Sequence, residues 1–256
     1  MKSETVNSVS RAMSILLLLY ERGREMSITE LGVELNMHKS TIFRILNSME
    51  QKGVVWQNPE TKKYWLGIKI FAMGELVGEK MSWKDFVQPY AEKLHEISNE
   101  TVNVSVLDTC ENDFHKSIVV LKESGFNRIM DINQPIGSSN YCYCSGVGKC
   151  LLAYKSQEEL DAVYRNKTMT RYTEHTITDG NIFLEELEKV RSQGYAMDRE
   201  EREVGLLCVA APIFNRNKEA FAAISIAGAT ARLKDELEER IRQVCHMAAL
   251  ISSKLN

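Results

Sequence analysis

The first eighty residues carry an ordered series of helix signals that few folds can accommodate. Ser27 and Glu30 have the spacing of a capping box, in which the serine hydroxyl accepts from an early backbone N–H and the glutamate reaches back to the serine N–H. The short helix that follows is expected to end at Asn36, a residue type that tolerates the left-handed conformation. A second amphipathic helix is expected over residues 39–51. Two helices separated by so short a turn predict a helix-turn-helix unit.

Flanking segments extend this unit in both directions. Upstream, apolar residues recur at spacings of three and four, which predicts the buried face of a helix that ends at Gly23: Val6, Val9, Met13, Leu16, Leu17 and Tyr20. Downstream, residues 54–56 and 64–66 are β-prone runs joined by a turn-rich loop. Helix, helix, turn, helix and hairpin is the order of a winged helix-turn-helix, which binds DNA.

The second helix of the motif has the two faces that a DNA-recognition helix needs. Its expected buried stripe is formed by Ile42, Ile45, Leu46 and Met49. The opposite face is short, polar and basic. Arg44 suits a bidentate contact with guanine, whereas Ser40 and Thr41 suit bases or phosphates. Lys39 is better suited to phosphate.

The distribution of charge favours the N-terminal region as the part that meets a polyanion. The chain has 32 Lys and Arg against 35 Asp and Glu, a net charge of −3. Residues 1–80 hold 11 basic and 9 acidic residues, whereas residues 81–256 hold 21 and 26. Lys62 and Lys63 at the hairpin tip are placed to neutralise phosphates. A helical protein-interaction module with a solvated polar face is the alternative.

The segment after Gly67 predicts a helix that needs a partner on more than one face. Its apolar residues are Ile68, Ile70, Phe71, Met73, Leu76 and Val77. We expect a connecting helix packed in a dimer, although the periodicity also fits an ordinary core helix. The expected domains are residues 5–67 for DNA binding, 68–82 for the linker helix and 83–256 for the remainder.

Residues 83–256 mix helix and strand patterns in an irregular order. Val102, Val104 and Val106 alternate as in a half-buried strand. Further strands are expected over residues 117–121, 128–132, 206–213 and 220–226, and a long apolar-faced helix closes the chain. Strands separated by unequal helices predict an α+β domain with an antiparallel sheet.

One segment of this domain has the composition of an anion site. Ser145 is expected to cap a helix, and Gly146 and Gly148 leave its first N–H groups accessible. The segment is not a Walker loop, because Tyr143 and Cys150 stand where that motif has a glycine and a hydroxyl residue. A carboxylate therefore fits better than a triphosphate, with a tightly packed helix start as the alternative.

Three other polar or reactive positions lie among apolar residues. Asp198 belongs to an acidic segment, residues 198–201, whose commoner outcome is a solvated turn. Cys208 lies in an apolar strand, where cysteine is usually a small core side chain. Ser225 should either hydrogen-bond locally or face a cavity.

The six cysteines form no recognisable zinc or catalytic motif. A zinc site built from Cys142, Cys144, Cys208 and a His or Asp is chemically plausible, because thiolates suit zinc, but no ligand spacing supports it. A nucleophilic Cys208 with His175 or His246 as its base lacks a local signature. We therefore expect no metal, no cofactor and no enzymatic activity. No segment is long enough to span a bilayer and none resembles a signal peptide, so we expect a cytoplasmic protein.

Taken in order, these motifs resemble the isocitrate lyase regulator (IclR) family of bacterial transcription factors over nearly the whole chain. The matching N-terminal positions are residues 10–12, 39–41, 44–46, 53–55 and 64–67. The matching C-terminal positions are residues 146–149, 194–198, 200–201, 205, 208–212 and 222–226. The resemblance implies a winged helix-turn-helix, a dimerising linker helix and a GAF-like effector domain.

The resemblance also implies partners. Such a protein is a repressor or activator that binds double-stranded promoter DNA as a homodimer or homotetramer. Its effector is a small organic acid or an aromatic carboxylate. Arg11, in the family signature, and Ser27, at the cap before the motif, join the expected DNA-binding residues.

The resemblance places an effector pocket at the backbone of Gly146 and Val147 and at the side chains of Asp198, Cys208 and Ser225. The family pattern often has a second serine two residues after Ser225, where this chain has Ala227. That departure argues against a glyoxylate-like or pyruvate-like ligand. Aromatic bulk from residues 141–144 is expected to shape the pocket.

Overall fold

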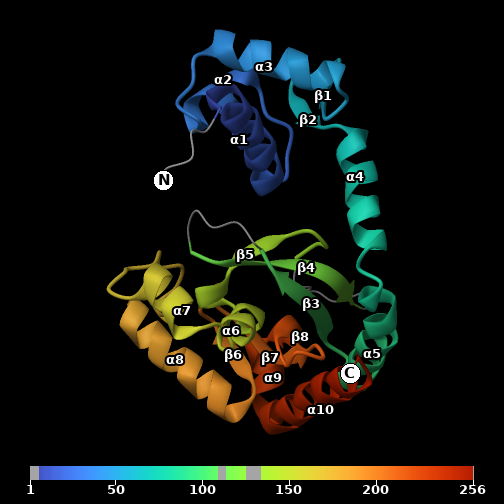
Figure 1. Ribbon diagram of the computed structural model, residues 1–256, viewed down its shortest axis with the longest axis vertical. Helices are drawn as coiled ribbons and strands as arrows, with labels where there is room; N and C mark the ends of the chain where they lie inside the picture. The colour runs from blue at the N-terminus through green and yellow to red at the C-terminus, as the bar shows by residue number, and fades with distance from the viewer. Residues whose placement is uncertain (1–5, 109–113, 125–133, 256) are drawn as a thin grey trace. The chain divides into compact units, whose positions relative to one another are not determined.

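The computed structural model describes residues 6–108, 114–124 and 134–255 of the chain. These residues belong to two compact units, Met1–Ser82 and Trp83–Asn256 (Figure 1). The strand expected over residues 128–132 lies outside the described residues, as does Cys110.

The first unit contains a helix-turn-helix followed by a two-stranded hairpin. Its elements are α1 (Asn7–Arg22), α2 (Ile28–Glu34), α3 (Lys39–Gln51), β1 (Val55–Gln57), β2 (Tyr64–Leu66) and α4 (Ile68–Glu79). The capping box is confirmed, because the Ser27 hydroxyl accepts from the Glu30 N–H and the Ser27 N–H donates to the Glu30 carboxylate. Gly23 ends α1 and Asn36 follows α2, both with positive φ, as expected. The order of a winged helix-turn-helix is thus confirmed.

The buried face of α1 differs from the expected one. The core of the unit includes Ile15, Leu18, Leu19, Ile42, Leu46 and Met49. Val9, Met13 and Leu17 of the expected stripe are instead about half exposed. The expectation was wrong because the continuous apolar run at residues 15–19 places apolar side chains on every side of α1, so spacing alone did not identify the buried side.

Helix α4 buries none of its side chains within the described chain. Ile68, Phe71, Leu76 and Val77 are each more than 60% exposed. The alternative of an ordinary core helix is therefore wrong for the single chain. None of the described helices has the length and apolar character that crossing a membrane requires.

The second unit is built on an antiparallel sheet with the strand order β5-β4-β3-β8-β7-β6. The strands are β3 (Thr101–Leu107), β4 (Lys116–Glu123), β5 (Ser139–Tyr141), β6 (Ala196–Arg199), β7 (Leu206–Phe214) and β8 (Ala220–Ala229). The helices are α5 (Trp83–Ser98), α6 (Gly146–Leu152), α7 (Gln157–Tyr164), α8 (Gly180–Gln193), α9 (Thr230–Leu233) and α10 (Leu237–Leu255). Single 3-10 turns occur at η1 (Cys142–Cys144) and η2 (Lys234–Glu236). Because every strand pairs antiparallel, the α+β class is confirmed.

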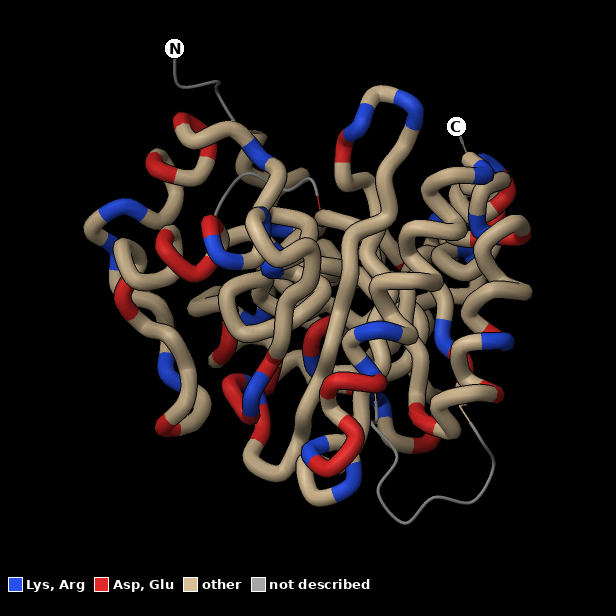
Figure 2. Tube along the Cα trace, turned by 90° about the horizontal axis from the view of Figure 1, so that it is seen from below, with Lys and Arg blue, Asp and Glu red and all other residues tan. Residues whose placement is uncertain are grey.

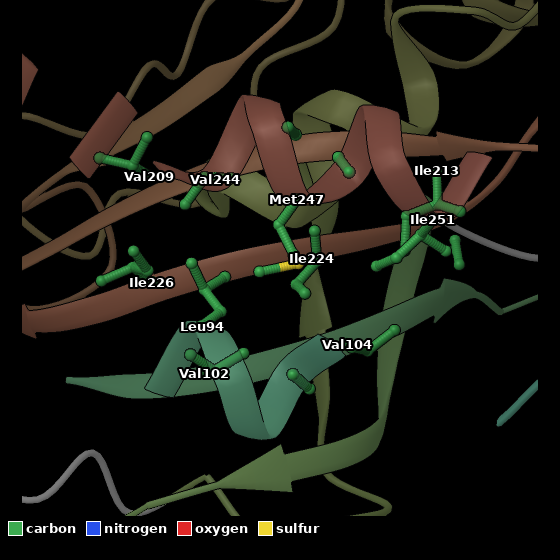
Figure 3. Close-up of a cluster of buried hydrophobic side chains, with 14 of the residues drawn as sticks. Leu94, Val102, Val104, Val209, Ile213, Ile224, Ile226, Val244, Met247 and Ile251 are labelled. Carbon is green, nitrogen blue, oxygen red and sulfur yellow. The ribbon is translucent and has the colours of Figure 1, made fainter. Parts of the chain in front are cut away.

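One face of this sheet packs against α5 and α10. Its core contains Leu94, Val102, Val104, Val209, Ile213, Ile224, Ile226, Val244, Met247 and Ile251 (Figure 3). The alternate side chains of β3, β7 and β8 are thus all aliphatic on this side, while the strand neighbours between them point the other way. The side chains of Met247 and Ile251 reach down from α10 towards Ile224 in the middle of the sheet (Figure 3).

The opposite face of the sheet carries α6, with α7 and α8 packed beyond it (Figure 1). Small side chains at Ala196, Ala210 and Ala223 allow α6 to lie close to the strands. All the residues of α6 are buried. Charged residues of both signs are spread along the peripheral helices and loops, so neither sign forms one large patch in this view (Figure 2).

Candidate functional site

The first unit has a groove between α1 and α3 that brings together the predicted DNA-contacting arginines. Arg11 from α1 and Thr41 and Arg44 from α3 line this groove, together with Ser48. Helix α1 packs beside α3, and Ala12, Ile45 and Met49 complete the wall of the groove. The resemblance gave Arg11 and the helix pattern gave Arg44, and the structure places them on the same surface.

The basic side chains of this surface lack acidic partners. Within the described chain, Arg11, Lys39 and Arg44 form no ion pair, and their side chains donate no hydrogen bond to a described residue. By contrast, Arg22 contacts Glu34 and Arg24 contacts Glu30, each at 2.7 Å. An uncompensated cation on an exposed surface is available to an external anion such as a DNA phosphate.

The hairpin is held against the preceding helices by polar contacts. The Glu25 carboxylate accepts from the Asn58 amide at 3.0 Å and from the Thr61 hydroxyl at 3.0 Å. These bonds fix the loop that presents Lys62 and Lys63, whose ammonium groups have no ion pair within the described chain. The structure therefore keeps both lysines at the tip, apart from the groove of α1 and α3.

Ser27, at the cap of α2, and Phe43 of α3 add to what the sequence predicted for this surface. The Ser27 hydroxyl is used as the helix cap, so its capping role is confirmed and its contact with DNA stays a prediction. Phe43 was not singled out from the sequence, yet it is 48% exposed in the middle of α3. It lies three residues after Ser40 and four before Asn47, so it shares a helix face with these two polar residues. The signal was present in the sequence, since Phe43 is an aromatic residue between the polar positions Ser40 and Asn47 of the expected helix.

The second unit has a cavity on the face of the sheet that α6 covers. Its lining includes side chains from every strand: Asn140 (β5), Ser117 (β4), Asn103 and Ser105 (β3), Ser225 and Ala227 (β8), Leu206 and Cys208 (β7), and Asp198 (β6). Val147 of α6 and Ser145, which precedes α6, close it. The enclosed part of the cavity is small, about 30 Å³, and it lies within about 410 Å³ of space that includes open solvent at the mouth.

The predicted residues Val147, Asp198, Cys208 and Ser225 are brought together in this cavity. Strand pairing explains the arrangement, because Asp198 lies opposite Cys208 and Asn103 lies opposite Ser225. Directly opposed residues of neighbouring strands point to the same face. Ser225 does both things expected of it: it lines the cavity and its hydroxyl lies 3.5 Å from the Asn103 carbonyl oxygen.

Asp198 is buried rather than part of a solvated turn. It is 4% exposed, and its carboxylate accepts from the Glu201 N–H at 2.7 Å. Burial raises the pKa of the Asp198 carboxyl to about 7, and the nearby charge of Glu201 adds to the shift. At neutral pH this group is thus close to its midpoint, so it can donate a hydrogen bond as an acid or accept one as a carboxylate.

The start of α6 is built differently from the expected anion site. Ser145 occupies the cap position, but its side chain makes no capping hydrogen bond and lines the cavity instead. Gly148 is needed for packing, because a Cβ there would lie 2.3 Å from the Cα of Cys142. A tightly packed helix start is therefore the correct interpretation for Gly148. Gly146 lies near the cavity, with Cys208 Sγ 3.3 Å from the position of a Cβ.

Lys149 ties α6 to the strand that carries Asp198. It is fully buried, and its ammonium group donates to the Met197 carbonyl at 2.9 Å and to the Glu201 carboxylate at 2.5 Å. Glu186 of α8 lies 3.7 Å away. Burial raises the pKa of Glu201, while Lys149 opposes that rise. The ion pair thus fixes Glu201 in the turn after β6, and the Glu201 N–H donates to the Asp198 carboxylate.

The comparisons with known proteins identify the family. The family described as the bacterial transcriptional regulator IclR C-terminal domain matches residues 78–253, and the IclR helix-turn-helix domain matches residues 8–59. The chain belongs to the IclR family of bacterial transcriptional regulators.

Full-length relatives agree. The IclR-type chain is 33% identical over 246 residues to the HTH-type transcriptional regulator KdgR of Escherichia coli, covering 96% of this chain and 91% of the relative. It is 32% identical over 231 residues to the transcriptional repressor IclR of the same species, covering 90% and 83%. These relatives are transcriptional regulators and not enzymes.

Solved structures share the fold. An IclR regulator from Alicyclobacillus acidocaldarius superposes with a TM-score of 0.82 at 23% identity, covering 99% of this chain and 100% of that chain. An IclR homologue from Microbacterium hydrocarbonoxydans, solved as a complex with 4-hydroxybenzoate, has a TM-score of 0.78 at 18% identity, covering 97% and 98%.

The aromatic residues before α6 do not line the cavity of this IclR chain, contrary to expectation. Tyr141 and Tyr143 stack on one another, and Tyr143 is fully buried against Phe114. They belong to the core beside α7 and α8. The residues that sequence reasoning missed are Asn103 and Ser105. Each alternates with a valine along β3, and both are at most 4% exposed.

The cysteines that the structure describes in this IclR chain all have a thiol pKa raised by burial, so none shows catalytic activation. Burial raises the pKa of the Cys208 thiol to about 12, and the charge of Asp198 adds to the shift, which disfavours the nucleophilic thiolate. Neither His175 nor His246 lines the cavity. No group of three or more His, Cys, Asp or Glu side chains suited to a metal ion occurs in residues 6–108, 114–124 or 134–255.

The buried ion pair gives a stability prediction. Lys149→Met leaves the buried Glu201 carboxylate without its cationic partner, so the free energy of unfolding of the second unit should fall by about 3–5 kcal/mol. The control is Lys155→Met, which breaks the solvent-exposed 3.3 Å contact with Glu159 and should change stability by only about 0–1 kcal/mol. Urea unfolding followed by far-UV circular dichroism measures both. Equal losses for the two variants would contradict the structural role of Lys149.

Proposed function

We propose that this IclR-type regulator binds promoter DNA through α3, the α1–α3 groove and the hairpin tip, and that a small organic acid in the cavity controls this binding. The observation that carries the DNA-binding part is the set of unpaired cations, Arg11 and Arg44, on one groove beside the polar start of α3. In a winged helix-turn-helix the second helix of the motif enters the major groove. Arg44 then reads guanine, while Arg11 and Lys39 neutralise phosphates.

A dimer is the proposed DNA-binding species, with a tetramer as a pair of such dimers. The support is the exposed apolar surface of α4, including Ile68, Phe71 and Val77, together with Val9 and Met13 of α1. Apolar surface of this extent on a monomer is typical of an interface. A two-fold dimer would present two recognition helices to half-sites of related sequence about one helical turn apart. Since it acts on the chromosome, its proposed location is the cytoplasm.

The effector is proposed to act by differential binding. A carboxylate in the cavity would contact the protonated Asp198 and the backbone near Gly146 and Val147. The ligand shifts the population of dimer or tetramer arrangements only by the difference between its affinities for them. Asp198, through Glu201 and Lys149, connects the cavity to α6 and α8, which are the elements that such a shift would displace.

Arg44 gives the first test of the DNA interface. Operators would be obtained by selecting tight-binding duplexes from a random pool with the full-length protein. Arg44→Ala should weaken binding to the selected operator by about 1–3 kcal/mol, because a bidentate base contact is lost. Arg22→Ala is the control, since Arg22 is already paired with Glu34 at 2.7 Å. Fluorescence anisotropy measures both affinities, and unchanged binding by Arg44→Ala would remove Arg44 from base recognition.

Phe43 gives a second test of the DNA interface, in which a single methyl group of the DNA is removed. An exposed aromatic ring on a recognition helix can contact the C5-methyl group of thymine. Phe43→Ala should weaken operator binding by about 1 kcal/mol, and replacing one thymine by uracil should weaken wild-type binding by a similar amount. The two losses should not add at the thymine that Phe43 contacts. Fully additive losses at every thymine of the operator would exclude this contact.

Asp198 gives a pH test of the effector site. Because burial raises its pKa to about 7, Asp198 is protonated below pH 7 and ionised above it. A ligand carboxylate should therefore bind more weakly as pH rises from 6 to 8.5, approaching about a tenfold loss per pH unit above the pKa. Asp198→Asn should bind with a flat profile and retain operator affinity. Calorimetry with a carboxylate found by thermal-shift screening would measure this, and a flat wild-type profile would refute the contact.

A further inference from the structure

We propose that Thr173 and Thr176, in the loop between α7 and α8, are positioning residues of the cavity: their hydroxyls hold the two peptide groups whose N–H groups face Asp198. No residue of this loop, 165–179, is among the described residues that line the cavity. The two threonines therefore act on the site through another segment and not by contact with it. This link involves no ligand, and only its consequence for an effector rests on the proposed function.

Two short hydrogen bonds join this loop to the turn between β6 and β7. The Thr173 hydroxyl donates to the Glu200 carbonyl at 2.6 Å, and the Thr176 hydroxyl donates to the Glu201 carbonyl at 2.6 Å. The bonded residues are 27 and 25 positions apart in the chain. Neither bond therefore follows from local chain geometry, and both depend on the packing of the loop against the turn.

The Thr176 hydroxyl uses all of its hydrogen-bonding capacity in this role. Besides donating to the turn, it accepts from the backbone N–H groups of Tyr172 at 3.0 Å and of Thr173 at 2.9 Å. A hydroxyl group has one donor and two acceptor sites. Thr176 is only 4% exposed, so bulk water does not replace these bonds when the hydroxyl is removed. The backbone of the loop and the backbone of the turn are thus joined through one oxygen atom.

Each of the two carbonyls belongs to a peptide group whose N–H faces Asp198. The Glu200 carbonyl shares its peptide group with the Glu201 N–H, which donates to the Asp198 carboxylate at 2.7 Å. The Glu201 carbonyl shares its peptide group with the Arg202 N–H, which also donates to Asp198. Because a trans peptide group is planar, a bond that holds its carbonyl on one side directs its N–H to the other side. The two threonine hydroxyls therefore orient both donors.

The turn needs support from outside because its backbone is strained. Glu200 has a φ of 61°, a left-handed conformation that is unfavourable for a residue with a side chain. Such a conformation persists where the surrounding contacts over-determine it. Here the Glu200 carbonyl is held by Thr173, and the guanidinium of Arg202 lies 3.9 Å from the centre of the Tyr172 ring. The loop therefore contacts the turn at the strained residue and again two residues later.

The orientation of these donors affects the ionisation of Asp198. Burial, and then the charge of Glu201 in the turn, raise the pKa of Asp198 to about 7, while the two backbone N–H groups and Lys149 of α6 oppose that rise. The other ionisable groups around Asp198 are the thiols of Cys208 on β7 and Cys144 of η1, both neutral at pH 7 because burial raises their pKa to about 12. A displaced loop would misalign the two donors, which stabilise only the carboxylate form.

The ionisation of Asp198 can be measured directly in the full-length protein. Carbon-13 NMR of protein labelled at the aspartate carboxyl carbons follows each carboxyl group through a pH titration, and the Asp198 signal is the one that Asp198→Asn lacks. Thr173→Val and Thr176→Val should each raise the pKa of Asp198 by about 0.5–1, because the carboxylate loses an aligned donor. Thr178→Val is the matched control on the same loop, since its hydroxyl accepts from Arg171 at 3.2 Å and not from the turn.

Conservative variants separate positioning from general support of the fold. Thr173→Ser and Thr176→Ser keep the hydroxyl and should keep the wild-type pKa of Asp198, as should Thr178→Val. An Asp198 pKa that is unchanged or lowered in one valine variant removes that threonine from the role. The same result in both valine variants overturns the proposal.

The wild-type protein supplies a second readout that does not depend on how well the valine variants fold. If both N–H groups donate to Asp198, the amide signals of Glu201 and Arg202 in a nitrogen-15 spectrum should titrate with the same midpoint as the Asp198 carboxyl carbon. Amide signals that show no such midpoint overturn the proposal. Neither measurement uses an effector or an operator, so a failure here leaves the proposed function standing, and a failure of operator binding leaves this assignment standing.

Discussion

The alternation of side chains across the six-stranded sheet determines the structure of the second unit, Trp83–Asn256. Val102 and Val104 on β3 turn towards α5 and α10, and Asn103 and Ser105 between them turn towards the cavity. A shift in register by one residue would exchange the two sets, placing amides in the aliphatic core and valines in the cavity. The aliphatic face therefore stabilises the fold and at the same time fixes which polar groups line the site.

The polar groups on the cavity face of the sheet lie next to a buried helix, so they need hydrogen-bond or ionic partners to offset their burial. Lys149 provides one by neutralising Glu201 at 2.5 Å, and the Glu201 N–H in turn orients Asp198. Gly148 contributes by allowing α6 to approach η1 more closely than any side chain would permit. The Glu201 N–H thus holds the Asp198 carboxyl in place, so this part of the cavity wall is already formed without a ligand. On the α1–α3 surface of the DNA-binding unit the arrangement is the opposite, since Arg11, Lys39 and Arg44 have no acidic partner within the described chain.

The sequence was informative where local chemistry decides the structure. Ser27 and Glu30 predicted a helix start because the bonds of a capping box are made within one turn. The buried stripe of α3 was also predictable, since its other face is polar. Helix α1 misled because residues 15–19 are apolar on all sides, so only the tertiary neighbours decide which side is buried. Asp198 and Cys208 were placed at the site by resemblance, and the structure supplies the pairing of β6 with β7 that brings them together.

Other features were not predictable from local pattern. Asn103 and Ser105 alternate with valines, a pattern typical of a strand with one solvated face, and only the packing of α6 buries the second face. Tyr141 and Tyr143 lie next to the site in sequence but turn into a separate core with Phe114. Gly148 resembled an anion-binding glycine, whereas its role depends on Cys142. In each case the deciding contact comes from another element of the fold.

The central claim is that one unit reads DNA and the other controls that reading through a small ligand. The most direct measurement is the affinity of the full-length protein for a duplex selected from a random pool, taken with and without the small organic acid that binds best in a thermal-shift screen. The account predicts preference for that duplex over a scrambled one, weakening with salt, and a change in affinity when the acid is added. Binding that shows no preference for the selected duplex, or an affinity that the acid leaves unchanged, would contradict it.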